Sequence, residues 1–294
     1  MPILRQANGV MIEFFNGHKF DFGCASGALG FYGNGWWFEQ PWRWIGLLRP
    51  EEFTIITKTL TYYPRKGNLR WYAPWRAVRF IENGVVNCVG LTNPGFRWWL
   101  SKPYQYTQKK GYKVIPSLAP DTLAEAKEMA LAFNGLKIVG IQLNVCPNTE
   151  WKSIDLICSI VSEFLKYTEH PTTLKLGENY LRVCQELDTR LTAFELINSV
   201  PYEQFYSCPS PLEKYGYKGS VSGGKIRYHA RTALVTAKKS GIKTPIISGG
   251  ANDSYEEVKW RLEHDADGIV FGTLYIKKAW LPNVIVSKMR GYEY

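Results

Sequence analysis

The stretch PIISGGANDSYEEVKWRLEHDADGIVFGT, residues 245–273, contains two short apolar runs on either side of one amphipathic pattern. The runs PIISGG (245–250) and GIVFGT (268–273) both reach glycine where they end. Between them, DSYEEVKWRLEH repeats apolar residues at three-to-four spacing, which indicates a helix with Asp253 at its N-cap. Strand, helix and strand in this order predict two parallel strands joined by a crossover helix.

The same alternation runs through the rest of the chain. Helix patterns occupy residues 121–133, with Asp121 at the N-cap position, and residues 151–167 and 225–239. Strands that are apolar on both faces and alternate with such helices predict a parallel sheet covered on both sides. Eight units predict an α/β protein of the (β/α)8 class, a closed TIM barrel, as one domain over residues 1–294. The eight strand-like runs are FDFGCA (20–25), FTIITK (53–58), VIPSLA (114–119), IVGIQLNV (138–145), TTLKL (172–176), AFELINS (193–199), PIISGG and GIVFGT.

Two segments depart from this alternation. Asn16-Gly17 separates two alternating runs near the N-terminus, which predicts a hairpin that closes the bottom of the barrel. Residues 59–113 are rich in proline and glycine and too long for an ordinary connection. We expect them to form an elaborated loop region over the barrel mouth.

The composition predicts a soluble, cytoplasmic protein. Of the 294 residues, 45% are hydrophobic, yet no apolar run approaches the roughly 20 residues that span a membrane. The six cysteines form no CxxC pair and indicate neither a metal site nor a disulfide framework. A net charge of +10 favours anionic partners, although the dispersed basic residues also fit an ordinary solvated surface. The aromatic cluster 34–45 fits either a docking patch or a cover for one end of the core.

The active site of such a barrel lies at the C-terminal ends of its strands. Lys58 and Lys175 end the second and fifth strands and would point into one mouth, which favours an anionic ligand. Glycine-rich turns follow the seventh and eighth strands, and GSVSGG (219–224) adds a third. A single glycine pair is common in ordinary tight turns. Three glycine-rich turns together predict a phosphate-bearing cofactor held by backbone N–H groups.

Side-chain amides surround the same predicted mouth. Asn87, Asn144, Asn148 and Asn198 each offer a donor and an acceptor, which suits a ring with alternating N–H and C=O groups, such as a pyrimidine dione or a flavin. Cys146 lies between two of these amides and is a candidate general base or nucleophile. A cysteine at a strand end is also commonly structural.

These motifs resemble those of the class 1 dihydroorotate dehydrogenases, nearer the NAD-linked catalytic subunit than the fumarate-using enzyme. The similarity runs over almost the whole chain, and nine motifs follow in the order of the family. They are ASGALGF (25–31), KTLTYYPRKGN (58–68), NCVGLTNPGF (87–96), LNVCPN (143–148), LKL (174–176), INS (197–199), SVSGGKI (220–226), ISGG (247–250) and FGT (271–273).

The resemblance implies FMN in the barrel mouth and dihydroorotate beside it. The positions that match flavin contacts are Ala25, Ser26, Gly27, Lys58, Thr59, Asn144, Lys175, Ile197, Gly223, Gly249, Gly250, Gly272 and Thr273. The positions that match substrate contacts are Lys58, Asn87, Gly90, Leu91, Asn144, Asn148, Asn198 and Ser199. Cys146 matches the catalytic base, with Lys175 and Lys58 as further catalytic residues.

The implied reaction is oxidation of (S)-dihydroorotate to orotate, a step of pyrimidine (UMP) biosynthesis. Cys146 would remove the proton from C5 while hydride leaves C6 for the flavin. The resemblance also implies a homodimer, or a heterotetramer with an electron-transfer subunit that carries FAD and an iron-sulfur cluster. Neither a membrane nor a nucleic acid is expected as a partner.

The sequence departs from the family pattern near Cys146. The usual serine before the cysteine is missing, so that only Val145 separates Cys146 from Asn144, and the lid that follows is short. SLAP (117–120) also lacks the usual glycine. These departures leave open a flavin-binding protein without turnover, a reductase of free pyrimidines, and a tRNA-dihydrouridine synthase, whose RNA would suit the basic charge.

Overall fold

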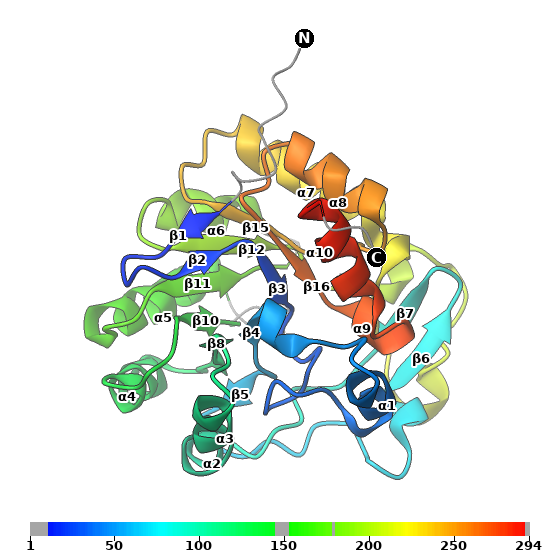
Figure 1. The fold of residues 1–294 in the computed structure, drawn as a ribbon, viewed down its shortest axis with the longest axis horizontal. Helices are drawn as coiled ribbons and strands as arrows, with labels where there is room; N and C mark the ends of the chain where they lie inside the picture. Colours follow the sequence, from blue (N-terminus) through cyan, green and yellow to red (C-terminus); the bar gives the residue numbers. More distant parts are fainter. Residues whose placement is uncertain (1–10, 145–152, 178–179, 292–294) are drawn as a thin grey trace.

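The computed structural model describes residues 11–144, 153–177 and 180–291. Its centre is a parallel sheet of ten strands (Figure 1). The sheet closes on itself at residues 114–119, where Pro116 separates two strand segments. The first segment pairs with β4 and the second with β10, so the predicted barrel is confirmed. The strands are β3 (Phe22–Cys24), β4 (Thr54–Ile56), β5 (Leu60–Thr61), β8 (Val114–Ile115), β9 (Ser117–Ala119), β10 (Ile141–Leu143), β11 (Thr172–Lys175), β12 (Ala193–Leu196), β15 (Ile246–Ser248) and β16 (Gly268–Phe271).

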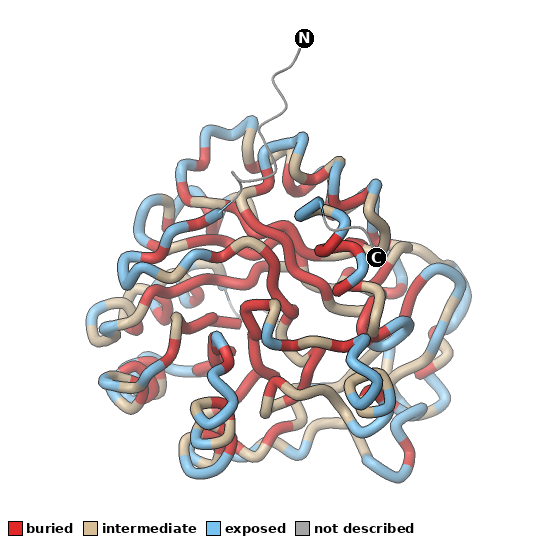
Figure 2. The backbone as a smooth tube through the Cα atoms, in the orientation of Figure 1, coloured by how far each residue is buried: buried red, intermediate tan, exposed pale blue. Residues whose placement is uncertain are grey.

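Helices surround the barrel, whose strands are largely buried (Figure 2). Apolar side chains of the helices pack on the strands in one hydrophobic core. The predicted helices are present. The two N-caps that were predicted lie one residue later than expected. The hydroxyl groups of Thr122 and Ser254, rather than the carboxylates of Asp121 and Asp253, accept the backbone N–H of the third residue of their helices. Thr122 and Ser254 are the residues directly before the first helical turn. The helices are α1 (Gln40–Trp44), α2 (Phe96–Ser101), α3 (Pro103–Lys109), α4 (Leu123–Phe133), α5 (Ile154–Tyr167), α6 (Tyr180–Leu187), α7 (Arg227–Lys239), α8 (Tyr255–Glu263), α9 (Thr273–Lys277) and α10 (Leu281–Met289). No helix in the described ranges is long and apolar enough to cross a membrane.

An antiparallel hairpin, β1 (Ile12–Glu13) and β2 (Lys19–Phe20), closes the bottom of the barrel as predicted. Phe14 and Phe20 belong to the apolar cluster of the barrel interior. A Cβ added to Gly23 or Gly268 would lie 2.8 or 2.9 Å from the ring of Phe20. Glycine at these two positions therefore lets the ring enter between neighbouring strands.

Residues 59–113 divide into two structural parts. Strands β6 (Val78–Ile81) and β7 (Gly84–Asn87) join β13 (Val200–Pro201) and β14 (Ser220–Ser222) in an antiparallel sheet of order β13-β14-β7-β6. This sheet lies at the barrel mouth, since β13 follows the C-terminal end of β12. Helices α2 and α3 belong instead to the barrel wall, so the elaborated region is shorter than predicted.

The aromatic cluster 34–45 covers part of the core, and a docking role for its exposed rings stays a prediction. Trp42 packs against Trp280 with ring centroids 4.3 Å apart, and so covers the core. Trp37 and Trp44 remain 78% and 79% exposed.

We predict that Phe20→Ala lowers the free energy of unfolding by about 3–5 kcal/mol, because it removes a fully buried ring from between two strands. Phe15→Ala is the matched control, since Phe15 lies on the same hairpin and is 76% exposed, and its effect should stay within about 0.5 kcal/mol. Urea unfolding measures both. Equal losses would contradict the role given to the hairpin.

Candidate active site

Polar side chains occupy one layer of the barrel interior. Lys175 on β11 is the register partner of Glu195 on β12, and Ser117 on β9 is that of Gln142 on β10. Lys175 Nζ lies 2.7 Å from Glu195 Oε1, and Gln142 Nε2 donates to Glu195 Oε2 at 2.6 Å. Ser117 Oγ donates to Gln142 Oε1 at 3.1 Å. Each group therefore satisfies a neighbour in an interior where an unpaired charge would be costly.

This chain of contacts continues into the loops at the C-terminal ends of the strands. Thr59 Oγ1 lies 3.0 Å from Ser117 Oγ and 2.8 Å from Ser26 Oγ. Asn144 Nδ2 donates to Thr59 Oγ1 at 2.9 Å. We call the connected side chains the polar belt. Its members are Ser26, Thr59, Ser117, Gln142, Asn144, Lys175 and Glu195.

The polar belt is incomplete at Asn144. Asn144 Oδ1 is buried and has no hydrogen-bond partner within the described part of the chain. A buried acceptor of this kind is satisfied in most proteins. A ligand in the mouth with an N–H group would complete the belt.

Lys58 is a second buried cation beside the belt. Only 9% of the residue is exposed, and its ammonium forms no salt bridge within the residues described. Burial lowers the pKa of Lys58 to about 8. At neutral pH the side chain therefore remains largely protonated, and an anion in the mouth would be drawn to it.

The predicted glycine turns lie next to one another. A Cβ added to Gly272 would lie 3.4 Å from Ala25 Cβ, and one added to Gly223 would lie 3.1 Å from Thr273 Cγ2. Thr273 Oγ1 donates to Ser222 Oγ at 2.8 Å. The loops that follow β3, β14 and β16 thus meet at one place.

The loop that follows β15 joins the same group. Gly250 has a φ of +74°, and a Cβ there would lie 3.0 Å from Ile226, just before α7. A Cβ on Gly249 would lie 3.5 Å from the carbonyl oxygen of Ile197. Backbone at the start of a helix, bordered by glycine, can hold a phosphate group of a cofactor.

The residues predicted to hold substrate are less closely connected. Asn87 ends β7 beside Ser220, and Gly90, with a φ of +66°, packs against Asn68. Leu91 has a φ of +53°. In the described ranges, no hydrogen bond joins Asn87, Gly90 or Leu91 to the polar belt.

Asn198 and Ser199 lie nearer the polar belt. The Asn198 backbone N–H donates to Leu176 O at 2.9 Å, one residue beyond Lys175. Asn198 Oδ1 accepts the backbone N–H of Ser199 at 3.0 Å. The predicted Cys146 and Asn148 lie outside the described residues.

Sequence reasoning missed two structural supports of this site. Ser117, Gln142 and Glu195 stand as single polar residues inside apolar runs, which is the signal that could have identified them. Trp36 is the second support, since its Nε1 donates to Gly27 O at 2.9 Å and holds the first loop.

Comparison with known proteins agrees with the resemblance drawn from the motifs. No protein-family model matches the chain. The catalytic subunit of dihydroorotate dehydrogenase B (NAD(+)) from Thermoanaerobacter pseudethanolicus is 27% identical over 251 residues, 81% of this chain and 80% of the relative. The putative dihydroorotate dehydrogenase A (fumarate) of Aeropyrum pernix is 30% identical over 247 residues, 81% of this chain and 78% of the relative. On this similarity, which spans most of both proteins, the chain belongs to the dihydroorotate dehydrogenase family.

Proposed function

We propose that this protein is an FMN-dependent oxidoreductase that converts (S)-dihydroorotate to orotate in pyrimidine biosynthesis. The observation that supports this most directly is that a buried polar belt and the buried cation Lys58, which forms no salt bridge among the described residues, lie together at the mouth of the barrel. A flat, anionic heterocycle fits this combination, since it needs both in-plane hydrogen bonds and a counter-ion.

The residues present fit FMN. The converging loops at Gly223, Gly249, Gly250, Gly272 and Thr273 would hold its phosphate. Asn144, whose side-chain oxygen has no partner among the described residues, and Lys175 would contact the flavin ring from the belt. When bound, FMN supplies the acceptor for the hydride that leaves C6 of dihydroorotate.

The remaining roles fall to the substrate residues. Cys146, as a thiolate, would take the proton from C5, so that loss of one proton and one hydride gives the C5–C6 double bond of orotate. Lys58 would bind the substrate carboxylate. Asn87, Asn148, Asn198 and Ser199 would orient the ring through amide and hydroxyl groups.

Turnover would also need a second acceptor that reoxidises the cofactor. The Thermoanaerobacter relative is described as the catalytic subunit of an NAD(+) enzyme. We propose that this chain likewise works with an electron-transfer subunit that carries FAD and an iron-sulfur cluster; the assembly expected is a heterotetramer with that subunit, or a homodimer without it.

We expect anaerobic addition of dihydroorotate to bleach the visible flavin absorption of the purified protein. Cys146→Ser should slow this bleaching by about 10²–10⁴-fold, because the base is lost while the flavin site is kept. Cys158→Ser, on α5, is the matched control and should react at the wild-type rate. Stopped-flow absorbance measures all three.

A flavin that dihydroorotate leaves oxidised would contradict the proposed activity and favour a binding protein without turnover. Reoxidation of the reduced protein faster by uracil than by orotate would instead identify a reductase of free pyrimidines.

Lys58→Met should weaken orotate binding by about tenfold or more, because a charged hydrogen bond to the carboxylate is lost. In the wild type, orotate affinity should fall as the pH rises above about 8, since Lys58 then loses its proton before binding. The variant should lack this pH dependence, whereas Lys109→Met, at an exposed position, should retain it. Equilibrium titration with orotate from pH 6 to pH 10 measures the effect (a range of about two units on each side of that pKa). The same pH profile in both variants would refute the role of Lys58.

A further inference from the structure

Three cations surround one tyrosine ring beside β6, the edge strand of the antiparallel sheet at the barrel mouth. We call this sheet of β13, β14, β7 and β6 the mouth sheet. Tyr215 lies on η5 (Glu213–Tyr215), a short 3-10 helix. Arg76 and Arg79 lie 5.2 and 5.9 Å from the centroid of its ring, and Lys214 lies 5.3 Å from it. Arg79 Nη2 also donates to Tyr215 Oη at 3.1 Å. The ring therefore gathers three positive charges into one cluster.

This cluster has no counter-ion within the described residues. None of Arg76, Arg79 and Lys214 forms a salt bridge there, whereas arginines elsewhere, such as Arg227, pair with carboxylates. Arg79 Nε is buried and has no acceptor. Like charges held together repel one another, so an anion bound between the side chains would relieve this repulsion.

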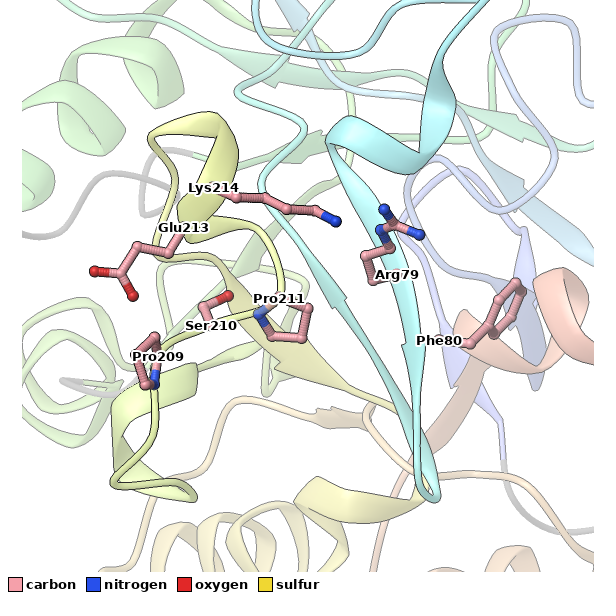
Figure 3. Close-up of a pocket in the computed structure, with 7 residues that line it drawn as sticks. All are labelled: Arg79, Phe80, Pro209, Ser210, Pro211, Glu213 and Lys214. Atoms are coloured by element: carbon pink, nitrogen blue, oxygen red, sulfur yellow. The ribbon is translucent and has the colours of Figure 1, made fainter.

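A cavity adjoins the cluster. Its volume is about 630 Å³, and Arg79 and Lys214 line one side, with the Lys214 ammonium directed toward the guanidinium of Arg79 (Figure 3). Ser210, Pro209 and Pro211 line the other side. Glu213 also borders the cavity, but its carboxylate points away from Arg79 (Figure 3).

We propose that this cavity binds a small anion that carries phosphate groups. An arginine fork donates two parallel hydrogen bonds to phosphate oxygens, and a lysine adds a point charge. Its volume, which falls within the range of small-molecule sites, leaves room for a phosphate ester as well as for inorganic phosphate. The buried Ser210 lies within reach as a polar wall of the same cavity.

The site is separate from the one assigned to FMN. Arg79 lies on β6, the edge strand of the mouth sheet, whereas the glycine loops lie around β15 and β16. The two are nevertheless linked through the backbone, since Arg79 pairs with Val86, the neighbour of Asn87 on β7. The inference goes beyond the proposed function and does not depend on it.

Calorimetric titration of the full-length protein with inorganic pyrophosphate tests the proposal. The wild type should bind one equivalent at constant ionic strength. The affinity of the double variant Arg79→Gln with Lys214→Gln should be lower by about tenfold or more. The matched control is Lys109→Gln with Lys110→Gln, which removes the same charge from exposed positions and should bind as the wild type does.

Loss of affinity by equal factors in both double variants, or no saturable binding to the wild type, would overturn the proposal. Pyrophosphate bound at the glycine loops would persist in the Arg79 and Lys214 double variant, and that result would overturn it too. Thermal denaturation checks that the variants fold, and the single variant Lys214→Gln, at an exposed residue, should already weaken binding. Tighter binding of a nucleoside diphosphate than of pyrophosphate would identify the ligand as a phosphate ester. Equal affinity for the two compounds would identify inorganic phosphate. Both outcomes support the site.

Discussion

The ion pair between Lys175 and Glu195 is the constraint on which the upper half of the barrel depends. Both residues are almost fully buried and lie opposite each other on adjacent strands. Removing one partner of such a pair costs about 3–5 kcal/mol, yet replacing both by apolar residues is often neutral. Stability alone therefore does not explain the pair. The pair lies at the C-terminal ends of the strands, beside the place where we propose that FMN binds.

The barrel interior is divided into two zones with different chemistry. Toward the bottom, Phe14 and Phe20 of the hairpin pack with Ile56 and Val270 in an apolar cluster. Toward the mouth, the polar belt replaces this packing with hydrogen bonds from strand to strand. The apolar zone provides cohesion, and the polar zone fixes the positions of Lys175 and Asn144. This division is what allows charged groups to be held rigidly in a protein interior.

Most of the fold could be predicted from the sequence because eight apolar runs recur along the chain and segments with helix periodicity lie between them. The N-caps were displaced by one residue, since Asp121-Thr122 and Asp253-Ser254 each place two good capping residues side by side. Residues 59–113 were harder to assign, because β6 and β7 form a sheet with strands more than a hundred residues away.

The residues of the candidate site that could be predicted from position are those at the ends of predicted strands. Lys58, Thr59, Asn144 and Lys175 follow from position alone, and the structure places them at the mouth. Glu195 and Gln142 are visible as polar residues inside apolar runs, but their partners could not be assigned, because pairing depends on the register between strands, which apolar patterning does not specify. The role of Cys146 stays a prediction from the motif.

The most direct measurement is an equilibrium titration of flavin-free protein with FMN, followed by the quenching of flavin fluorescence. If the belt and the glycine loops form a flavin site, one FMN should bind per chain. The Lys175→Met variant, which removes the cation opposite Glu195, should then bind FMN more weakly. FMN that fails to bind saturably to the folded wild type would contradict the account.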